Sequence, residues 1–483
     1  MVPKQIQKID DYTWELSKNY KKGMLVPARI IATEKLLNQM DQGVFEQVSN
    51  MATMPGIQKY ALCMPDGHWG YGFPIGGVAA FDADKGIISP GSIGFDINCG
   101  MRLISTNISY DEIKSKIKVL VDSLFEKVPS GVGSSGALNL NKQSFKNLAE
   151  NGVEWCVENG YGWENDLKHI EDNGKIIQAN IEHVSERAIK RGFNQVGTLG
   201  SGNHYLEIQV VPPENIFNEN IAEKFGIKPD KVCVMVHTGS RGFGHQIATD
   251  YLRLFGDAMK KYGIKVNDKE LACAPFNSNE GQKYFSAMAC GANMAFANRQ
   301  IITNTLRNVF SKLFGRTAED MEMNLVYDVA HNIAKVEKYK INGEKKDLIV
   351  HRKGATRSFG PGRKELPEVY KEIGQPVILG GSMETGSYLL LGTKKAEETT
   401  FGSTAHGSGR VMSRHKAKEQ CQGKKIQKRM MEQGIYVRSS SMSGLAEEAG
   451  LAYKNINDVV ETVHNADISK KIAAMKPIGN IKG

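Results

Sequence analysis

Apolar residues recur at helical spacing in several long segments of this chain. Across residues 109–128 the apolar positions stand three or four residues apart, so that they share one face of a helix. Comparable segments predict helices over residues 176–191, 246–262, 284–314, 413–433 and 445–463. The mixed charged and apolar pattern before about Ser49 predicts further helices joined by loops.

Shorter apolar runs predict strands between these helices. Residues 206–210 alternate apolar with polar positions, as a half-buried strand does, and residues 232–236 are apolar throughout, as in a fully buried strand. Further strands are predicted over residues 324–329, 377–381 and 387–392 and, with turns, within the Gly- and Pro-rich residues 61–102. Asn342-Gly343 stands between two strand-like runs and predicts a tight hairpin turn. Together these elements predict a mixed α/β fold with central strands surrounded by helices.

The composition is that of a globular protein in a reducing compartment. Hydrophobic residues make up 41% of the 483 residues and charged residues 24%. The chain has no run of about 18 apolar residues that would span a membrane, and its first residues lack a signal-peptide core. Seven scattered cysteines do not form a disulfide framework. We therefore expect a cytoplasmic protein. The net charge of +9 is compatible with a polyanionic substrate.

A carboxylate and a thiol stand three residues apart in a Gly-punctuated turn, at Asp96 and Cys99. This pairing of a hard and a soft ligand suits a transition metal such as Zn²⁺, Mn²⁺ or Fe²⁺. Histidines follow in similar polar, Gly-rich breaks, at His204, His237 and His331. Five ligands exceed the need of one tetrahedral ion, whereas two ions that share the Cys99 thiolate would use them all. Such a pair can stabilise the attacking and the leaving oxygen of a phosphoryl transfer.

His406 lies in a separate Gly-rich loop, residues 401–410. Since the other ligands suffice for metal, a neutral histidine here can instead attack phosphorus and form a phosphoramidate. Asn203 and Glu207 should share one face of a strand and could contact one ligand together; an ordinary polar strand face is the alternative. The loop that carries Arg241 offers an anion cradle, although its glycine spacing matches a dinucleotide fingerprint only loosely.

Two groups of basic residues are interleaved with glycines, which favours phosphate contact over a merely solvated surface. They are Lys353, Arg357, Arg363 and Lys364, and Arg410, Arg414 and Lys416. Phe359, within the first group, could stack on a base or pack in the core. Because the candidate residues run from Asp96 to His406, we expect residues 1–483 to form one catalytic unit.

Taken together, these motifs resemble the RtcB family of RNA-splicing ligases. The matching stretches are residues 64–77, 94–100, 200–204, 237–242, 331–332, 380–383 and 406–410, in the family's order. The resemblance implies a family-specific mixed α/β fold and a GTP- and Mn²⁺-dependent ligase. Such an enzyme joins RNA 2′,3′-cyclic-phosphate or 3′-phosphate ends to 5′-hydroxyl ends, in tRNA splicing or RNA repair. An archease-type activator protein is a further partner that the resemblance leaves open.

The resemblance also implies roles for individual residues. Asp96, Cys99 and His204 would hold one Mn²⁺, and Cys99, His237 and His331 the other. His406 would be guanylylated by GTP, and GMP would then pass to the RNA 3′-phosphate, giving an activated end that the 5′-hydroxyl attacks. The residues implied to grip GMP are Asn203, Glu207, Ser387, Tyr453 and Lys482. Those implied to line the phosphate and RNA path are Arg241, Lys353, Arg410 and Arg414.

One residue departs from the family pattern. Glu384 stands where many relatives would have Gly, and it adds a negative charge near the expected nucleotide pocket. Two other functions are compatible with the same residues. One is a two-metal phosphoesterase without covalent guanylylation, and the other is an RNA-binding scaffold without catalysis.

Overall fold

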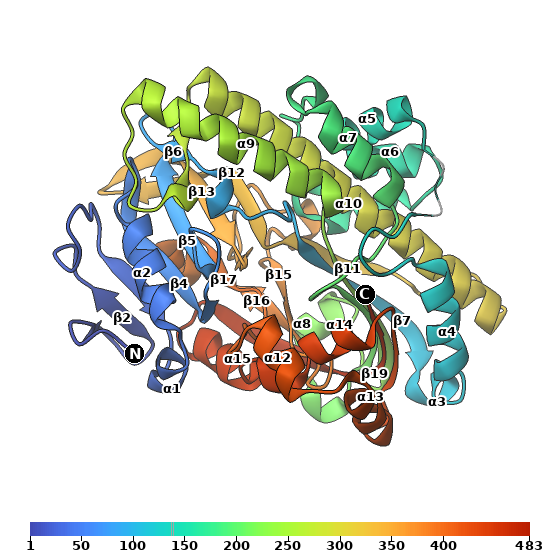
Figure 1. The fold of residues 1–483 in the computed structure, drawn as a ribbon. Helices are drawn as coiled ribbons and strands as arrows, with labels where there is room; N and C mark the ends of the chain where they lie inside the picture. The colour runs from blue at the N-terminus through green and yellow to red at the C-terminus, as the bar shows by residue number, and fades with distance from the viewer. Residues whose placement is uncertain (137, 139) are drawn as a thin grey trace.

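A computed structural model describes residues 1–136, 138 and 140–483 and has the expected mixed α/β architecture (Figure 1). One sheet of the described chain has seven strands, in the order β1 (Gln7–Lys8), β2 (Thr13–Leu16), β3 (Ala28–Ile31), β4 (Ile57–His68), β5 (Ile75–Asp82), β13 (Glu344–Lys353) and β12 (Asn332–Ile341). Only the β3–β4 pair in it is parallel.

The second large sheet carries most of the candidate ligands at one edge. Its order is β11 (Leu325–Ala330), β7 (Gly100–Ser109), β9 (Lys231–Thr238), β8 (Tyr205–Val210), β19 (Ser469–Lys482), β16 (Ser387–Gly392) and β15 (Pro376–Gly380), with β18 (Tyr436–Ser439) parallel to β19. Two small pairs join β6 (Ile87–Ile88) to β10 (Ala274–Pro275), and β14 (Ala355–Arg357) to β17 (Ser403–Ala405).

Helices cover the sheets from several sides. They are α1 (Glu34–Asn38), α2 (Gln42–Met51), α3 (Tyr110–Ile113), α4 (Ile117–Lys127), α5 (Lys142–Asn151), α6 (Val153–Glu158), α7 (Glu186–Gly192), α8 (Glu219–Lys224), α9 (Arg241–Tyr262), α10 (Asn279–Phe314), α11 (Lys394–Thr400), α12 (Arg414–Gln420), α13 (Gly423–Glu432), α14 (Met442–Glu447) and α15 (Ile456–Asn465). Figure 1 shows α9 and α10 crossing one side of the molecule and the C-terminal helices α12–α15 on the opposite side.

Antiparallel register explains why residues far apart in the sequence meet at this edge. β7 begins at Gly100, which pairs with Thr238 at the end of β9 and with Ala330 at the end of β11. β8 begins at Tyr205, which pairs with His237. Two strand starts and two strand ends therefore lie side by side. The residues at and just beyond these strand ends therefore lie close together.

The central strands are buried on both faces, as the apolar run in β9 predicts. Val234 and Val236 pack with Leu206 of β8 on one face, whereas Met235 and Tyr205 pack on the other. The remaining strand predictions are also confirmed. The hairpin at Asn342-Gly343 joins β12 to β13, with Ile341 paired to Glu344 and both turn residues at positive φ.

Some predicted boundaries are wrong because periodicity does not reveal a break between two short helices. Residues 176–185 hold only a single 3-10 turn, Ile181–His183, before α7. The segment 413–433 is divided into α12 and α13 at Cys421, and 445–463 contains a loop with Tyr453 between α14 and α15. The stretch before Ser49 contains three strands besides α1 and α2. None of the helices in the described part of the chain combines the length and the apolar character that a membrane span needs.

Candidate metal centre and nucleotide cavity

The five residues expected to bind metal lie together as two triads that share one thiol. Asp96, Cys99 and His204 have ligand atoms within 4.8 Å of one another, and so have Cys99, His237 and His331. The Cys99 Sγ lies 3.4 Å from His204 Nε2 and 3.3 Å from His237 Nε2. The Asp96 carboxylate is 2.9 Å from His204 Nε2. This is the shared-ligand arrangement expected from the number of donors.

Backbone carbonyls orient two of the imidazole rings. His204 Nδ1 lies 3.0 Å from the Leu199 carbonyl oxygen, and His237 Nδ1 lies 3.1 Å from that of Asn203. With Nδ1–H donated to a carbonyl, Nε2 keeps its lone pair and faces the Cys99 thiol, which is the usual preparation of a metal-binding histidine. Gly239 is required here, because a Cβ at this position would come within 2.5 Å of the Asp96 carboxylate.

The protonation states also suit cation binding. Burial, followed by the nearby histidine charges, lowers the pKa of His237 and His331 well below the usual value, so both rings are neutral. Burial would raise the pKa of the Asp96 carboxyl, but the His204 hydrogen bond and charge outweigh it and lower that pKa. Burial and the Asp96 charge raise the pKa of the Cys99 thiol. A cation between these groups would offset the cost of the thiolate, as metal ions do for cysteine ligands.

Arg299 of α10 holds the edge that carries the triads. Its Nη1 donates to the carbonyl oxygens of Asn98 (2.9 Å) and Thr238 (2.8 Å), and its Nε and Nη2 donate to the Asp328 carboxylate. All of these groups are buried, so each bond is shielded from water. The loop before β7 and the end of β9 are thereby fixed relative to β11.

His406 projects toward the second triad from the end of β17. Its ring centroid lies 5.0 Å from that of His331. Its Nδ1 is 2.5 Å from Asp66 Oδ2, and its backbone N–H donates to the same oxygen at 3.0 Å. Burial would raise the pKa of Asp66, but the His406 charge and hydrogen bonds, together with Lys454, lower it. The carboxylate therefore accepts the proton on Nδ1 and leaves Nε2 as the basic atom.

Asp66 is a functional candidate to which the sequence analysis assigns no role. The pair with His406 is separated by 340 positions in the sequence, which no local pattern links. Lys454 Nζ holds the Asp66 loop by donating to the carbonyl oxygens of Pro65 (3.0 Å) and Gly67 (2.7 Å). The only sequence signal is the presence of Asp66 within the matched stretch 64–77.

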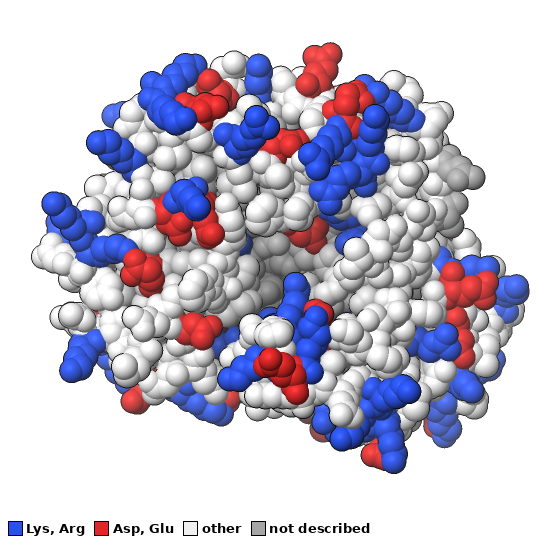
Figure 2. Space-filling model, viewed as in Figure 1, with Lys and Arg blue, Asp and Glu red and all other residues white. Residues whose placement is uncertain are grey.

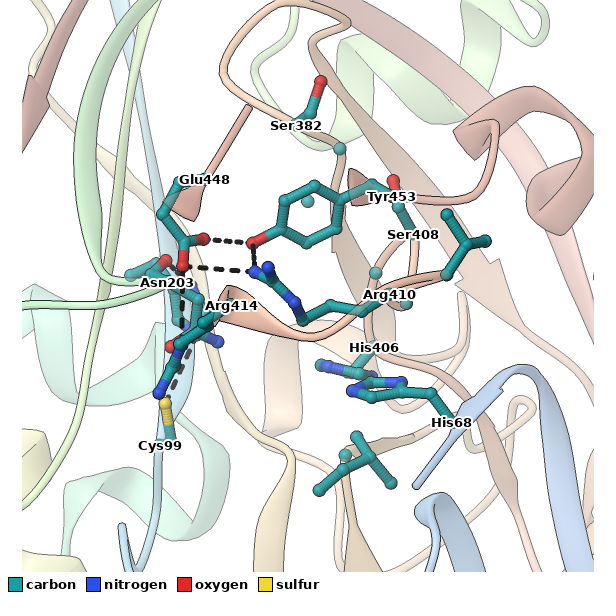
Figure 3. Close-up of a pocket in the computed structure, with 18 of the residues that line it drawn as sticks. His68, Cys99, Asn203, Ser382, His406, Ser408, Arg410, Arg414, Glu448 and Tyr453 are labelled. Carbon is teal, nitrogen blue, oxygen red and sulfur yellow. Dashed lines mark hydrogen bonds and ion pairs between the residues drawn. The ribbon is translucent and has the colours of Figure 1, made fainter. Parts of the chain in front are cut away.

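The two triads and the His406–Asp66 pair open into one cavity of about 780 Å³, visible as the hollow at the centre of Figure 2, with both basic and acidic side chains around it. Its walls include Asp96, Cys99, His237, His331, His406, Asn203, Tyr205, Ser382, Arg410, Arg414, Tyr453 and Lys482. Figure 3 shows His406 beside His68, apart from a linked group of Tyr453, Arg410 and Glu448. The Tyr453 hydroxyl contacts Glu448 and lies 3.1 Å from Arg410 Nη1.

The residues expected to grip the nucleotide divide into two layers. Asn203, Tyr453 and Lys482 line the cavity, and Lys482 Nζ donates to the carbonyl oxygens of Gly202 (3.3 Å) and His204 (3.4 Å). Glu207 and Ser387 are each 1% exposed and lie behind this wall. Gln209 Nε2 links them by donating to Glu207 Oε2 (2.7 Å) and to Ser387 Oγ (3.0 Å). Burial raises the pKa of Glu207 to about 7.

The four cationic residues expected on the RNA path do not all lie at the cavity. Arg410 and Arg414 line the cavity, and Arg414 is 55% exposed. Arg241 lies beside the first triad, where its Nη1 is 3.5 Å from His204 Nδ1. Lys353 is 3% exposed and donates to the backbone carbonyls of Tyr71 and Gly91. The structure brings the first pair, but not Lys353, to the cavity.

Arg357 and Phe359 of this segment belong to the protein interior, whereas Arg363 is partly buried and Lys364 is exposed. Arg357 is 1% exposed and pairs with Glu171 at 3.1 Å, and Phe359 is fully buried in the core.

Glu384 is neutralised by Arg429, with Nη2 and Oε2 2.7 Å apart, and it accepts the Gly450 N–H at 2.9 Å. Its charge therefore fixes the loop before Tyr453 and is not directed at the nucleotide wall.

A mixed α/β fold that places two triads able to hold metal and an oriented histidine in one cavity, with Arg410, Arg414 and Lys482 in its walls, has groups suited to nucleotidyl or phosphoryl transfer. Comparison with known proteins narrows this class. A family model described as tRNA-splicing ligase RtcB matches residues 47–483. The chain belongs to the RtcB family, whose members are ligases, as the sequence motifs predict.

Full-length relatives agree with this assignment. The chain is similar to proteins named tRNA-splicing ligase RtcB from Archaeoglobus fulgidus, at 54% identity, and from Methanococcus maripaludis, at 53%, with 99% of each chain covered in both comparisons. A third relative of the same name, from Thermococcus kodakarensis, is 51% identical over 100% of this chain and 99% of its own.

Proposed function

We propose that this chain is a GTP- and Mn²⁺-dependent RNA ligase of tRNA splicing or RNA repair. It would join 2′,3′-cyclic-phosphate or 3′-phosphate ends to 5′-hydroxyl ends, with residues 1–483 working as one catalytic unit. The names of the relatives support the RNA-joining reaction. The observation that carries the proposal is the placement of His406, oriented by Asp66 and next to the triads that share Cys99.

In the first step, His406 Nε2 attacks the α-phosphorus of GTP. A P–N bond forms, the bond to the bridging oxygen breaks, and pyrophosphate leaves with its electron pair. The Nδ1 proton stays on the ring and is held by Asp66, whose negative charge balances the positive imidazole of the adduct. A buried charge-assisted hydrogen bond of this kind stabilises the adduct more than a neutral one would.

The donor set supports a pair of divalent transition-metal ions, for which we propose Mn²⁺. Asp96, Cys99 and His204 would hold one ion, and Cys99, His237 and His331 the other. Bound there, the ions would neutralise negative charge on phosphate oxygens. Carboxylate, imidazole and thiolate together also accept Zn²⁺ and Fe²⁺, so the preference for Mn²⁺ rests on the family resemblance.

The second step brings the RNA 3′-phosphate to His406, and the third step brings the 5′-hydroxyl end to that phosphate. A 2′,3′-cyclic phosphate would first be hydrolysed to a 3′-phosphate. An oxygen of the RNA 3′-phosphate attacks the GMP phosphorus and breaks its bond to His406 Nε2. The 5′-hydroxyl oxygen then attacks the RNA phosphorus, loses its proton and displaces GMP. Arg410 and Arg414 at the cavity wall supply cationic groups for RNA phosphates. Asn203, Tyr453 and Lys482 line the wall that would receive GMP, whereas contacts of Glu207 and Ser387 with GMP remain predictions. An archease-type activator and a cytoplasmic location likewise remain predictions.

A joining assay tests the proposal. One RNA with a 3′-phosphate and one with a 5′-hydroxyl are incubated with protein, Mn²⁺ and GTP, and the product is resolved by size. We expect GTP-dependent joining that His406→Ala abolishes. A two-metal phosphoesterase would instead release phosphate without GTP and join nothing, and that result would replace the proposal.

A further inference from the structure

Trp69 is an exposed aromatic side chain at the wall of the catalytic cavity. Its side chain is 66% exposed, and it lines the cavity with Asp41, His68, Gly70 and Ile75. Single exposed apolar residues are common and need no explanation of their own. Trp69 differs from such residues in two ways. Its position is fixed, and it lies beside the part of the cavity that reaches His406.

The loop that carries Trp69 is anchored to α2. Gln47 Nε2 donates to the Gly70 carbonyl oxygen at 2.6 Å, and Gln47 Oε1 accepts the Gly70 N–H at 3.1 Å. His68, on the other side, ends β4 and has its Nδ1 3.0 Å from the Asp66 carbonyl oxygen. The backbone on both sides of the indole is therefore held.

The indole itself rests on a glycine of α2. A Cβ built on Gly43 would lie 2.7 Å from Trp69 Cε3 and 2.9 Å from Cδ2, so only glycine allows the ring to lie where it does. The helix thus supports part of the ring, while most of the side chain stays in contact with solvent. A ring that is supported and held in this way loses little entropy when a second flat group stacks on it.

The Trp69 side of the cavity reaches His406 but lies away from the nucleotide wall. A Cβ on Gly354 would come within 2.2 Å of Ile75 Cγ2 and 3.2 Å of His406 Cε1, so Ile75 and His406 flank the same glycine. Figure 3 shows His406 and His68 together, apart from Tyr453 and Glu448. Trp69 follows His68 directly, so a ligand on the indole would approach His406 from the His68 part of the cavity wall and not from the part that carries Tyr453.

We propose that Trp69 is a stacking platform for a base of the RNA strand at the reacting ends. The inference rests on the proposed function, because it assigns the place of the RNA that the ligase would join. Single-stranded ends present unstacked bases, and proteins bind them by stacking on aromatic side chains beside a basic groove. Because any base offers a π face, the platform increases affinity without reading sequence.

The test measures RNA affinity in four variants of the full chain. Trp69→Leu removes the π face but keeps an apolar side chain, and Trp69→Phe keeps a smaller ring. Gly43→Leu retains the indole but occupies its resting place. The control is Tyr110→Ala. Tyr110 is a 43% exposed aromatic residue that begins α3, directly after the end of β7 that lies about 30 Å along the strand from Gly100. Thermal unfolding verifies that each variant is folded.

We expect Trp69→Leu to weaken RNA binding about 5- to 150-fold, as loss of one base–aromatic stack does elsewhere. Trp69→Phe should lose less, Gly43→Leu should bind weakly although Trp69 is present, and Tyr110→Ala should bind as the unaltered chain does. Strands with 2-aminopurine in the terminal nucleotide, on either the 3′-phosphate or the 5′-hydroxyl strand, identify the stacked base by quenching that Trp69→Leu abolishes.

Unchanged RNA affinity in Trp69→Leu, or quenching that persists in that variant on both strands, overturns the platform. The platform is also overturned if Trp69→Leu and Tyr110→Ala weaken RNA binding equally. Failure of the proposed function looks different: the unaltered chain would form no GMP adduct and join no RNA. The RNA titration decides the role of Trp69 in either case.

Discussion

Replacing Asp66 by Asn tests how the proposed nucleophile is activated. Asp66 Oδ2 accepts hydrogen bonds from His406 Nδ1 and from the backbone N–H groups of His406 and Gly407. An amide oxygen can occupy the same place, so the substitution removes the charge while the shape is kept. Asp66→Ala would instead leave two backbone donors without a partner and is a poorer probe.

The size of the effect follows from burial and distance. The His406–Asp66 contact is 2.5 Å long, with side chains 13% and 0% exposed, so water screens it little. A hydrogen bond to a charged group contributes roughly 1.5–3 kcal/mol. If that contribution is realised as positive charge develops on the ring, the rate of adduct formation should fall about 10- to 150-fold.

The assay is single-turnover formation of the acid-labile GMP adduct from labelled GTP, with bound metal measured in parallel. Metal content should not change, because Asp66 belongs to neither triad. Asp122→Asn, which removes a carboxylate paired with Arg438 outside the cavity, is the matched control and should react at the normal rate. An Asp66→Asn rate within about twofold of the control would refute activation by this carboxylate.

Four further substitutions test other parts of the account. Cys99→Ser should abolish guanylylation and reduce bound metal by more than one ion's share, and near-normal activity would contradict a shared thiolate. Glu207 has a folded-state pKa of about 7 against an ordinary 4.5, so its stabilising contribution is complete below pH 4.5 and is lost as the pH rises through 7. The free energy of unfolding of Glu207→Gln should therefore exceed that of the unaltered chain by up to about 3 kcal/mol at pH 8 and by almost nothing at pH 4. Calorimetric unfolding measures this difference, and an equal difference at both pH values would refute the raised pKa of Glu207. Arg410→Ala should reduce the slope of log RNA affinity against log salt by roughly 1, and an unchanged slope would exclude a phosphate contact. Glu384→Gly should lower the free energy of unfolding by about 1 kcal/mol through loss of its Arg429 pair while joining persists, and a loss of GMP-adduct formation would show that Glu384 acts on the nucleotide.

Strands and ligand positions could be predicted from the sequence, because each depends on local pattern. The apolar run of β9 and the Gly-rich break after it are adjacent in the chain, so His237 could be placed at a strand end before any fold was known. The register that joins Gly100 to Thr238 and Ala330 then brings the other ligands to the same edge. The count of donors anticipated the shared thiol.

Contacts that depend on tertiary packing could not be predicted. Lys353 and Arg357 stand among glycines like residues of a phosphate loop, but both are buried and bound to backbone carbonyls or carboxylates. Asp66 and His406 meet only because the strand pair β14–β17 packs against β4. The helix ends near Cys421 and Tyr453 could not be predicted because two short helices that follow each other in the chain continue the same apolar spacing. Such breaks are decided by packing rather than by local propensity.

His406 is the residue proposed to carry the guanylyl group. After incubation with GTP and Mn²⁺, intact-mass spectrometry should show a chain heavier by one GMP, and peptide mapping should place the group on the fragment that contains His406. The His406→Ala chain should keep its metal and show no added mass. An adduct at another residue, or one that persists in His406→Ala, would contradict the account.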